Sequence, residues 1–318
     1  MALIFDSLVQ GLQMILVLAL APLLTGLVRK VKARLLRRQG PSLIQPYRDL
    51  LRLIRKEAVV AENASWLFRA APYAIFAATW VAAALVPTFA SGLLFSWSAD
   101  VIAIVALLGS ARFFLTLAGM DVGTSFGGIG SSREVMIASL AEPAMLMVVF
   151  TLSLLAHSTQ LSTISQLISF SEVGLRVSLA MALIALILVA LAENARIPVD
   201  NPATHLELTM VHEAMVLEYS GRHLAMIEIG ASLKLVLYLS LIGALFLPLG
   251  MAAPGAGPAA YLVGLGAYLA KLALGGVLLG MFEISIAKMR VFRVPEFLGA
   301  ALMLGFLATL LLFVSRGL

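Results

Sequence analysis

Residues 177–202 read VSLAMALIALILVALAENARIPVDNP, and this stretch decides the fold. Its first part, up to Ala192, is an apolar run with no charged side chain, and its second part, from Glu193, is polar. A helix that crosses a membrane needs roughly 20 mostly apolar residues. With the two residues before it, the apolar run predicts a membrane span over 175–192 that ends at a charged loop.

The composition of the whole chain agrees with this interpretation. Of its 318 residues, 61% are hydrophobic and 12% are charged, whereas a soluble domain carries about 25% charge. This surplus of apolar residues needs lipid to cover it. The longest polar stretches, 29–71 and 193–222, are too short to bury a core of their own. We therefore expect an all-α, polytopic helix bundle that forms a single integral membrane domain over 1–318.

The absence of cysteine limits the chemistry of this chain. Without cysteine it has no disulfide, and it cannot ligate an iron–sulfur cluster or a Cys-containing zinc site. We predict no metal site on this chain, so any redox metal that its reaction uses lies on a partner. The net charge of +5 is explained by loop charges at a membrane, and no nucleic acid is expected.

Apolar runs of spanning length recur along the sequence. They predict about eight spans, at 4–28, 72–90, 100–118, 133–157, 175–192, 223–247, 259–282 and 296–315. The first is not a cleavable signal peptide, because its basic cluster follows the apolar run. No internal repeat is visible, which argues against an inverted-repeat transporter.

Loop charges predict the orientation of the bundle, because Lys and Arg are enriched in cytoplasmic loops. Segment 29–71 holds 11 of these residues, and the other loops on its side hold six more. The opposite side holds only Arg176 and Arg316. We therefore expect both termini outside, 29–71 as a cytoplasmic amphipathic loop, and 193–222 as a cytoplasmic acidic loop with a helix.

The first of these loops has the pattern of an amphipathic helix. Its apolar residues follow helical spacing from Tyr47 to Ile54, and the opposite face carries Arg48, Arg52 and Arg55. Such a basic face can lie on anionic lipid or dock a soluble partner protein. Both interpretations stay open, and both can hold at once.

A glycine-rich segment, 127–130, precedes the fourth predicted span. It lacks the Gly-Lys-Ser/Thr spacing of a phosphate-binding loop. Ser131 and Glu134 fit a capping box, so we expect a flexible turn followed by a capped helix. Glu142 lies about two turns into this apolar helix, where a carboxylate is costly unless it is paired or hydrated.

The polar segment 193–222 holds the most functional signals. Its two prolines favour an extended approach to a helix through Glu207, Glu213 and Glu218. Glu207 and Glu218 are 11 residues apart, which puts them on one helix face about 16 Å apart along the axis. Glu213 points elsewhere. Taken alone, the pattern also fits a cytoplasmic amphipathic helix with solvated carboxylates.

Three motifs together resemble the complex I subunit 1 family. They are Arg38-Gln39-Gly40-Pro41 with Gln45-Pro46, Asp49, Leu53 and Lys56-Glu57; GSSRE with AEP at 130–134 and 141–143; and Glu193-x-x-Arg196-x-Pro198-x-Asp200 with Glu207-Leu208 and Glu218-Tyr219-Ser220. The resemblance spans nearly the whole chain. It is strongest to the branch of group 4 membrane-bound nickel–iron hydrogenases, the formate hydrogenlyase and hydrogenase-4 membrane subunits.

Two differences separate the chain from the quinone-reducing branch of that family. Only residues 42–44 stand between the Gly-Pro and Gln-Pro of the first motif, where that branch has a longer stretch. Residues 203–205 read Ala-Thr-His, where that branch usually has further acids. Both differences argue against a quinone-binding chamber.

The resemblance also implies roles for individual residues. In this family the third motif faces a soluble redox arm and starts an acidic path into the membrane. The implied proton carriers are Glu134, Glu142, Glu193, Glu207, Glu213 and Glu218. The implied partner-docking residues are Arg48, Arg52, Arg55, Arg133, Arg196 and Asp200.

Charged residues also occur inside predicted spans. They are Arg112 in the third span, Glu228 and Lys234 in the sixth, and Lys271 and Glu283 in the seventh. Each central charge costs about 2.5–3.5 kcal/mol on the insertion scale. Ion pairing explains any one of them, but their recurrence favours a hydrated proton route that includes Glu228, Lys234, Lys271 and Glu283. Glu283 and Arg112 are expected near the cytoplasmic interface.

The resemblance implies a non-catalytic, proton-conducting membrane anchor in a bacterial or archaeal cytoplasmic membrane. Its expected partners are a hydrogenase large subunit with a nickel–iron centre, a small subunit with 4Fe–4S clusters, and further antiporter-like membrane subunits. One alternative is the quinone-site subunit of an NADH:quinone oxidoreductase. An alternative of another class is a freestanding ion transporter, which should show repeats and broken helices at mid-membrane.

Overall fold

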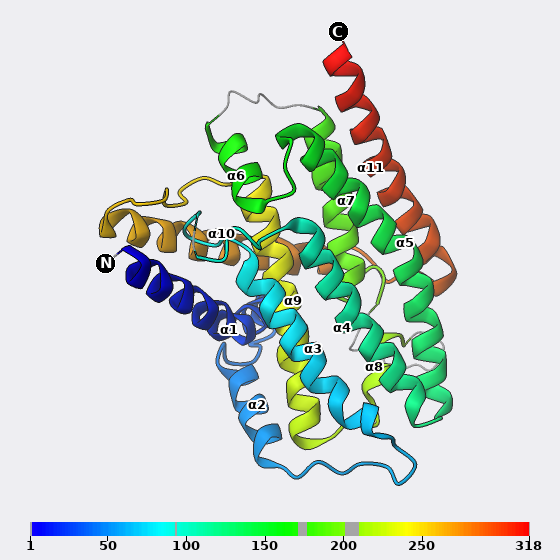
Figure 1. Cartoon of the computed structure of the whole chain (residues 1–318). Helices are drawn as coiled ribbons and strands as arrows, with labels where there is room; N and C mark the ends of the chain where they lie inside the picture. The colour runs from blue at the N-terminus through cyan, green and yellow to red at the C-terminus, as the bar shows by residue number, and fades with distance from the viewer. Residues whose placement is uncertain (1, 93, 171–176, 201–209, 318) are drawn as a thin grey trace.

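A computed structural model describes residues 2–92, 94–170, 177–200 and 210–317 (Figure 1). The described residues form helices and no multi-residue strand. The helices are α1 (Ala2–Leu35), α2 (Gln45–Arg55), α3 (Trp66–Leu85), α4 (Val101–Asp121), α5 (Ser125–Ala156), α6 (Leu161–Phe170), α7 (Val177–Glu193), α8 (His212–Val216), α9 (Gly221–Leu245), α10 (Pro258–Ser285) and α11 (Val294–Gly317). The predicted all-α, polytopic class is therefore confirmed.

Seven helices in the described ranges are long and apolar enough to cross a membrane: α1, α3, α4, α5, α9, α10 and α11. The remaining predicted span, 175–192, corresponds to α7, an apolar helix of 17 residues. The first two residues of that predicted span lie outside the described residues. The predicted spans thus agree with the helices, although α1 and α5 are longer than predicted.

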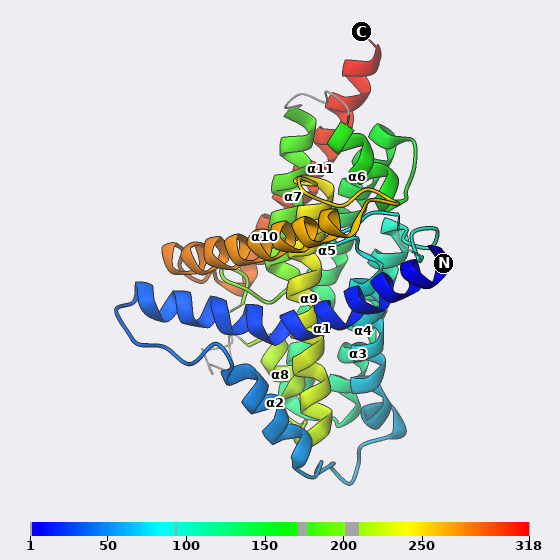
Figure 2. The same cartoon turned by 90° about the vertical axis from the view of Figure 1, so that its left-hand side faces the viewer.

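Helix α9 lies at the centre of the bundle (Figures 1 and 2). It packs against α1, α3 and α10, and its Leu233, Leu237 and Leu241 are fully buried. Helices α4, α7 and α11 surround α5, whereas α1 and α10 run across α9 (Figure 2). A Cβ atom at Gly276 of α10 would lie 2.9 Å from the side chain of Leu24 in α1, so the missing side chain lets these two helices approach closely.

The two polar stretches of the sequence meet at one end of the bundle. Helices α2 and α8 lie there, near the first residues of α3 and α5, while α6 and the end of α11 lie at the other end (Figures 1 and 2). Helices α3, α4, α5, α7 and α9 alternate in direction between these two ends (Figure 1). The assignment of these ends to the two sides of a membrane stays a prediction.

The prediction of a flexible glycine turn capped by Ser131 is wrong. Residues 125–130 are already helical, and Thr124 caps α5 by accepting a hydrogen bond from the Gly127 backbone N–H at 3.2 Å. A Cβ atom at Gly130 would lie 2.9 Å from the Val211 carbonyl oxygen. The glycines therefore serve close packing of α5 against its neighbours, and Ser131 Oγ instead donates to the Thr116 carbonyl at 3.0 Å.

The prediction of a continuous helix through Glu213 and Glu218 is also wrong. Helix α8 ends at Val216, and α9 begins at Gly221, whose φ of +54° favours glycine. Tyr219 anchors the turn between them, because its ring stacks on Phe68 and its hydroxyl donates to the Phe68 carbonyl at 3.0 Å. Burial raises the pKa of the Tyr219 hydroxyl, so it keeps the proton that it donates.

Candidate functional site: a buried network of ion pairs

Arg112 of α4 is the centre of a buried cluster of charges from four helices. It lies 3.4 Å from Glu134 and 3.2 Å from Glu142, both in α5. It also pairs with Glu193, the last residue of α7. Glu193 in turn forms an ion pair with Lys234 Nζ of α9, at 2.9 Å. We call these five residues the Arg112 cluster.

Helix geometry explains why one guanidinium reaches three carboxylates. Glu134 and Glu142 are eight residues apart on α5, or about 12 Å along the helix axis. Arg112 approaches from the neighbouring helix and uses Nε for one carboxylate and Nη1 for the other. Its Nη2 remains for Glu193, since a guanidinium carries five N–H donors in a fixed fork.

The Arg112 cluster combines deep burial with an excess of carboxylate. The side chains of Arg112 and Glu193 are 5% and 4% exposed, whereas that of Glu142 is 45% exposed. Three carboxylates face two cations, so with all groups ionised the cluster carries one net negative charge. One bound proton makes it neutral.

Two further buried carboxylates have their own cations. Glu283 of α10 pairs with Lys32 Nζ of α1 at 2.6 Å and with Arg196 Nη1 at 3.3 Å. Asp200 accepts from Lys288 Nζ at 3.0 Å and from the His212 backbone N–H at 3.2 Å. Both carboxylates are buried. We call these groups the Glu283 cluster and the Asp200 pair.

The segment 193–200 joins all three sites. Glu193 belongs to the Arg112 cluster, Arg196 to the Glu283 cluster and Asp200 to the Asp200 pair. Each charged residue of the Glu-x-x-Arg-x-Pro-x-Asp motif therefore meets a different partner of opposite charge. Along the motif the charges alternate in sign, and each has an opposite charge from another part of the chain beside it. The charges of a fully solvated loop would need no such partners.

The structure separates the predicted proton carriers into two groups. Glu134, Glu142, Glu193 and Lys234 come together, and Glu283 lies in the second cluster. Neither cluster, as far as the described residues define it, includes the remaining predicted carriers Glu213, Glu218, Glu228 and Lys271. Glu207 lies outside the described residues.

The predicted docking residues lie in two environments. Arg48, Arg52 and Arg55 are exposed on α2, as a contact surface requires. Arg133 donates to the Met210 carbonyl at 2.8 Å, and the remaining two, Arg196 and Asp200, take part in the internal ion pairs. Their roles in docking stay predictions.

Arg112 has a larger part in the ion-pair network than its sequence position indicates. It was expected near the cytoplasmic interface, yet it is 6% exposed and binds three carboxylates. A single Arg within an apolar span is the sequence signal that indicates this role, because such a charge needs several partners. No group of three or more His, Cys, Asp or Glu that could hold a metal ion occurs in the described ranges.

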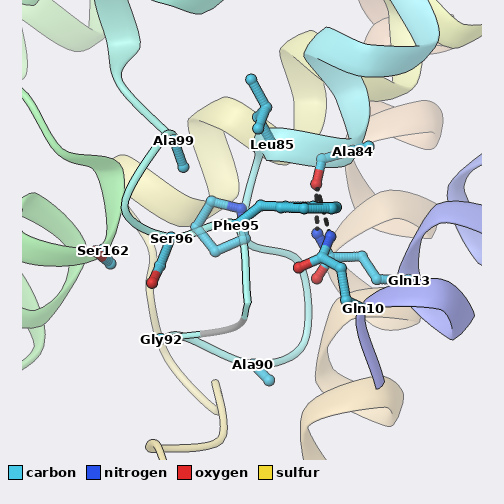
Figure 3. A pocket seen from close by; sticks show the side chains of 11 residues that line it. Gln10, Gln13, Ala84, Leu85, Ala90, Gly92, Phe95, Ser96, Ala99 and Ser162 are labelled. Atoms are coloured by element: carbon cyan, nitrogen blue, oxygen red, sulfur yellow. Dashed lines mark hydrogen bonds between the residues drawn. The ribbon is translucent and has the colours of Figure 1, made fainter. Parts of the chain in front are cut away.

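A small cavity of about 20 Å³ lies between α1, the end of α3 and the loop after it (Figure 3). Gln13 is buried there and donates to the carbonyls of Ala84 and Val86 at 3.1 and 2.9 Å, and Gln10 donates to Ala84 at 3.2 Å. These bonds satisfy carbonyls at the end of α3 that lack helical partners. The cavity has room for about one water molecule.

The fold and the site define a multi-pass helical membrane protein with a buried network of ion pairs. The family model described as NADH dehydrogenase matches residues 9–314, and the chain belongs to this family. It is similar to formate hydrogenlyase subunit 4 of Escherichia coli (strain K12), with 32% identity over 93% of this chain and 95% of that protein. Hydrogenase-4 component C of the same organism is 35% identical over 76% of this chain and 75% of that protein.

More distant relatives agree with this membership. NADH-ubiquinone oxidoreductase chain 1 of Triticum aestivum is 29% identical over 71% of this chain and 72% of that protein. A chain in the structure of the membrane-bound sulfane sulfur reductase, an archaeal respiratory membrane complex, has the same fold. Its TM-score is 0.83 at 18% identity, over 96% of this chain and 99% of that chain. The resemblance to the complex I subunit 1 family and its hydrogenase branch is therefore confirmed.

Proposed function

We propose that this chain is the proton-conducting membrane anchor of a complex I-like, membrane-bound hydrogenase. The Arg112 cluster is the single observation that carries the proposal. Five charged side chains from four helices meet in the bundle, and carboxylates in excess over cations suit transient proton binding. The identities of 32% and 35% to two hydrogenase-complex subunits, against 29% to an oxidoreductase chain, favour the hydrogenase branch.

In this proposal the chain moves protons while partners carry out the redox chemistry. A hydrogenase large subunit with a nickel–iron centre and a small subunit with 4Fe–4S clusters dock at the end that holds α2 and α8. A change of charge there alters the field at the segment 193–200, which supplies a charge to each buried site. Because the titrations of close carboxylates are coupled, that change redistributes protons among Glu134, Glu142 and Glu193.

The proposal places the complex in a bacterial or archaeal cytoplasmic membrane, with further antiporter-like membrane subunits beside this chain. Purification of the native complex tests its composition. Nickel and iron in the purified complex support the hydrogenase branch. A flavin-containing or quinone-linked arm without nickel supports the NADH:quinone alternative, and purification of the chain without any partner supports a freestanding transporter.

Replacement of Glu142 by Gln tests the proton path. Glu142→Gln keeps the volume and hydrogen-bonding capacity of the side chain but removes its titration. Assembly and hydrogen–dye turnover by the soluble subunits should be retained, while proton translocation falls about a hundredfold, the lower end of the range for loss of a proton-transfer group. Translocation is measured in proteoliposomes with a pH-sensitive dye.

Glu296→Gln is the matched control. Glu296 is 70% exposed at the start of α11 and pairs with Arg293 three residues earlier, so its loss should leave translocation unchanged. Wild-type translocation in both Glu142→Gln and Glu134→Gln would reject the Arg112 cluster as the path. Loss of nickel from the purified variants would instead indicate failed assembly.

A further inference from the structure

Helix α10 carries a lysine at its midpoint. Lys271 is the fourteenth of 28 residues, so about 20 Å of helix separates it from either end at 1.5 Å per residue. With α10 taken as a membrane span, a tilt changes the depth of its ends more than that of its midpoint, so we expect Lys271 near the centre of the membrane. A lysine side chain is too short to bring its ammonium group to either interface from there.

No carboxylate among the described residues pairs with this lysine. Its stem lies beside α9, where a Cβ atom at Gly243 would be 3.7 Å from Lys271 Cδ. Among the described residues, Lys271 has no ion-pair or hydrogen-bond partner. The other cations within spans, Arg112 and Lys234, both have carboxylate partners.

The surface around Lys271 is open and apolar. Of the seven candidate spans among the described residues, α10 is the least buried. Leu274 and Leu278, at 59% and 53% exposure, follow Lys271 at spacings of three and seven and therefore lie on its side of the helix. This side runs beside α9, and from Lys271 toward the end of α10 it presents an apolar strip with the ammonium group at its start.

We propose that this strip, formed by α10 beside α9, binds a membrane-spanning helix of a second subunit that carries an Asp or Glu facing Lys271. Charge complementarity selects this occupant. Lipid tails carry no charge at this depth, and lipid phosphates lie at the interfaces, whereas a carboxylate on a spanning helix reaches the ammonium group directly. The inference rests on the proposed function only in taking the chain as part of a larger membrane complex.

Site-specific crosslinking tests the partner. A photoreactive amino acid is placed at Leu274 in the intact complex, with Leu310 of α11, 44% exposed, as the control position. We expect a crosslink from position 274 to a spanning helix of another subunit, with an Asp or Glu within one turn of the linked residue. Crosslinks only to lipid, to a second copy of this chain, or to a helix without a carboxylate would overturn the proposal.

The charge itself is tested by Lys271→Met and Lys271→Arg. In complexes purified through a tagged soluble subunit, Lys271→Met should reduce the crosslinked subunit about tenfold, as expected for loss of one polar contact between spanning helices. Lys271→Arg should retain it. Full retention in Lys271→Met refutes the proposal, whereas a complex that lacks nickel but gives the expected crosslink refutes only the proposed hydrogenase function.

Discussion

Replacement of Arg112 by Met should destabilise the bundle strongly. The change removes three ion pairs and leaves Glu134, Glu142 and Glu193 with Lys234 as their remaining cation within the cluster. Removing one partner of a buried ion pair costs about 3–5 kcal/mol, because the other charge stays buried without compensation. The pair with Glu193 should dominate this cost, since both side chains are at most 5% exposed.

Exposure predicts how the cost divides between the carboxylates. Glu142 is 45% exposed, so fewer protein groups enclose its pair with Arg112, and its coupling should be about 0.5–1 kcal/mol, the low end for contacting residues in one network. The coupling to Glu193 should be about 2–3 kcal/mol, within the range for contacting residues in one network. Double-mutant cycles of Arg112→Met with Glu142→Gln and with Glu193→Gln separate the two terms.

The assay uses the absence of cysteine from the natural chain. A single Ala182→Cys, fully buried in α7, reports unfolding by its reaction with a maleimide as temperature rises. Arg112→Met should lower the midpoint clearly, and Arg48→Met, the same change at an exposed residue of α2, should not. Equal midpoints for the two variants, or a larger coupling to Glu142 than to Glu193, would refute the ion-pair argument.

Two further predictions concern the polar loops. Single cysteines at Ser42 and Met289 should react only with a reagent that reaches the cytoplasm, because loop charges place both there; labelling from the outside would reject the topology. Replacing Arg48, Arg52 and Arg55 together by Glu should release the soluble subunits while the chain stays inserted. If only lipid association changes, measured by vesicle flotation, α2 binds lipid instead of a partner.

The spans could be predicted from the sequence, but two local features could not. Apolar length alone identifies helices such as α4 and α9, because lipid requires every backbone group to be satisfied within the helix. The local structure predicted for the glycine segment before Glu134 was wrong. Glycine is typical of turns, yet Gly130 serves the contact with Val211, and this contact depends on a residue 81 positions later in the chain.

The charge network illustrates a different limit. The sequence identifies Glu142, Glu193 and Lys234 as costly within apolar spans, and that cost predicts partners. It does not say which partner each residue finds, because the pairs join positions up to 251 residues apart, as Lys32 and Glu283 do. Arg112 was underestimated for the same reason: its importance comes from three neighbours on two other helices.

The segment 193–200 explains how an event at the polar end could reach the middle of the bundle. Glu193, Arg196 and Asp200 lie within eight residues and hold partners on α4, α9 and α10 and at Lys288. A displacement of this short segment would therefore change three buried sites together. Moving Glu193 away would separate it from both Arg112 and Lys234, and separating the partners of a buried ion pair is costly, so the sites favour a common arrangement. In the proposed function, a docked partner and the proton site are coupled through an element that both contact. The segment 193–200 is that element, and it begins at the last residue of the apolar helix α7.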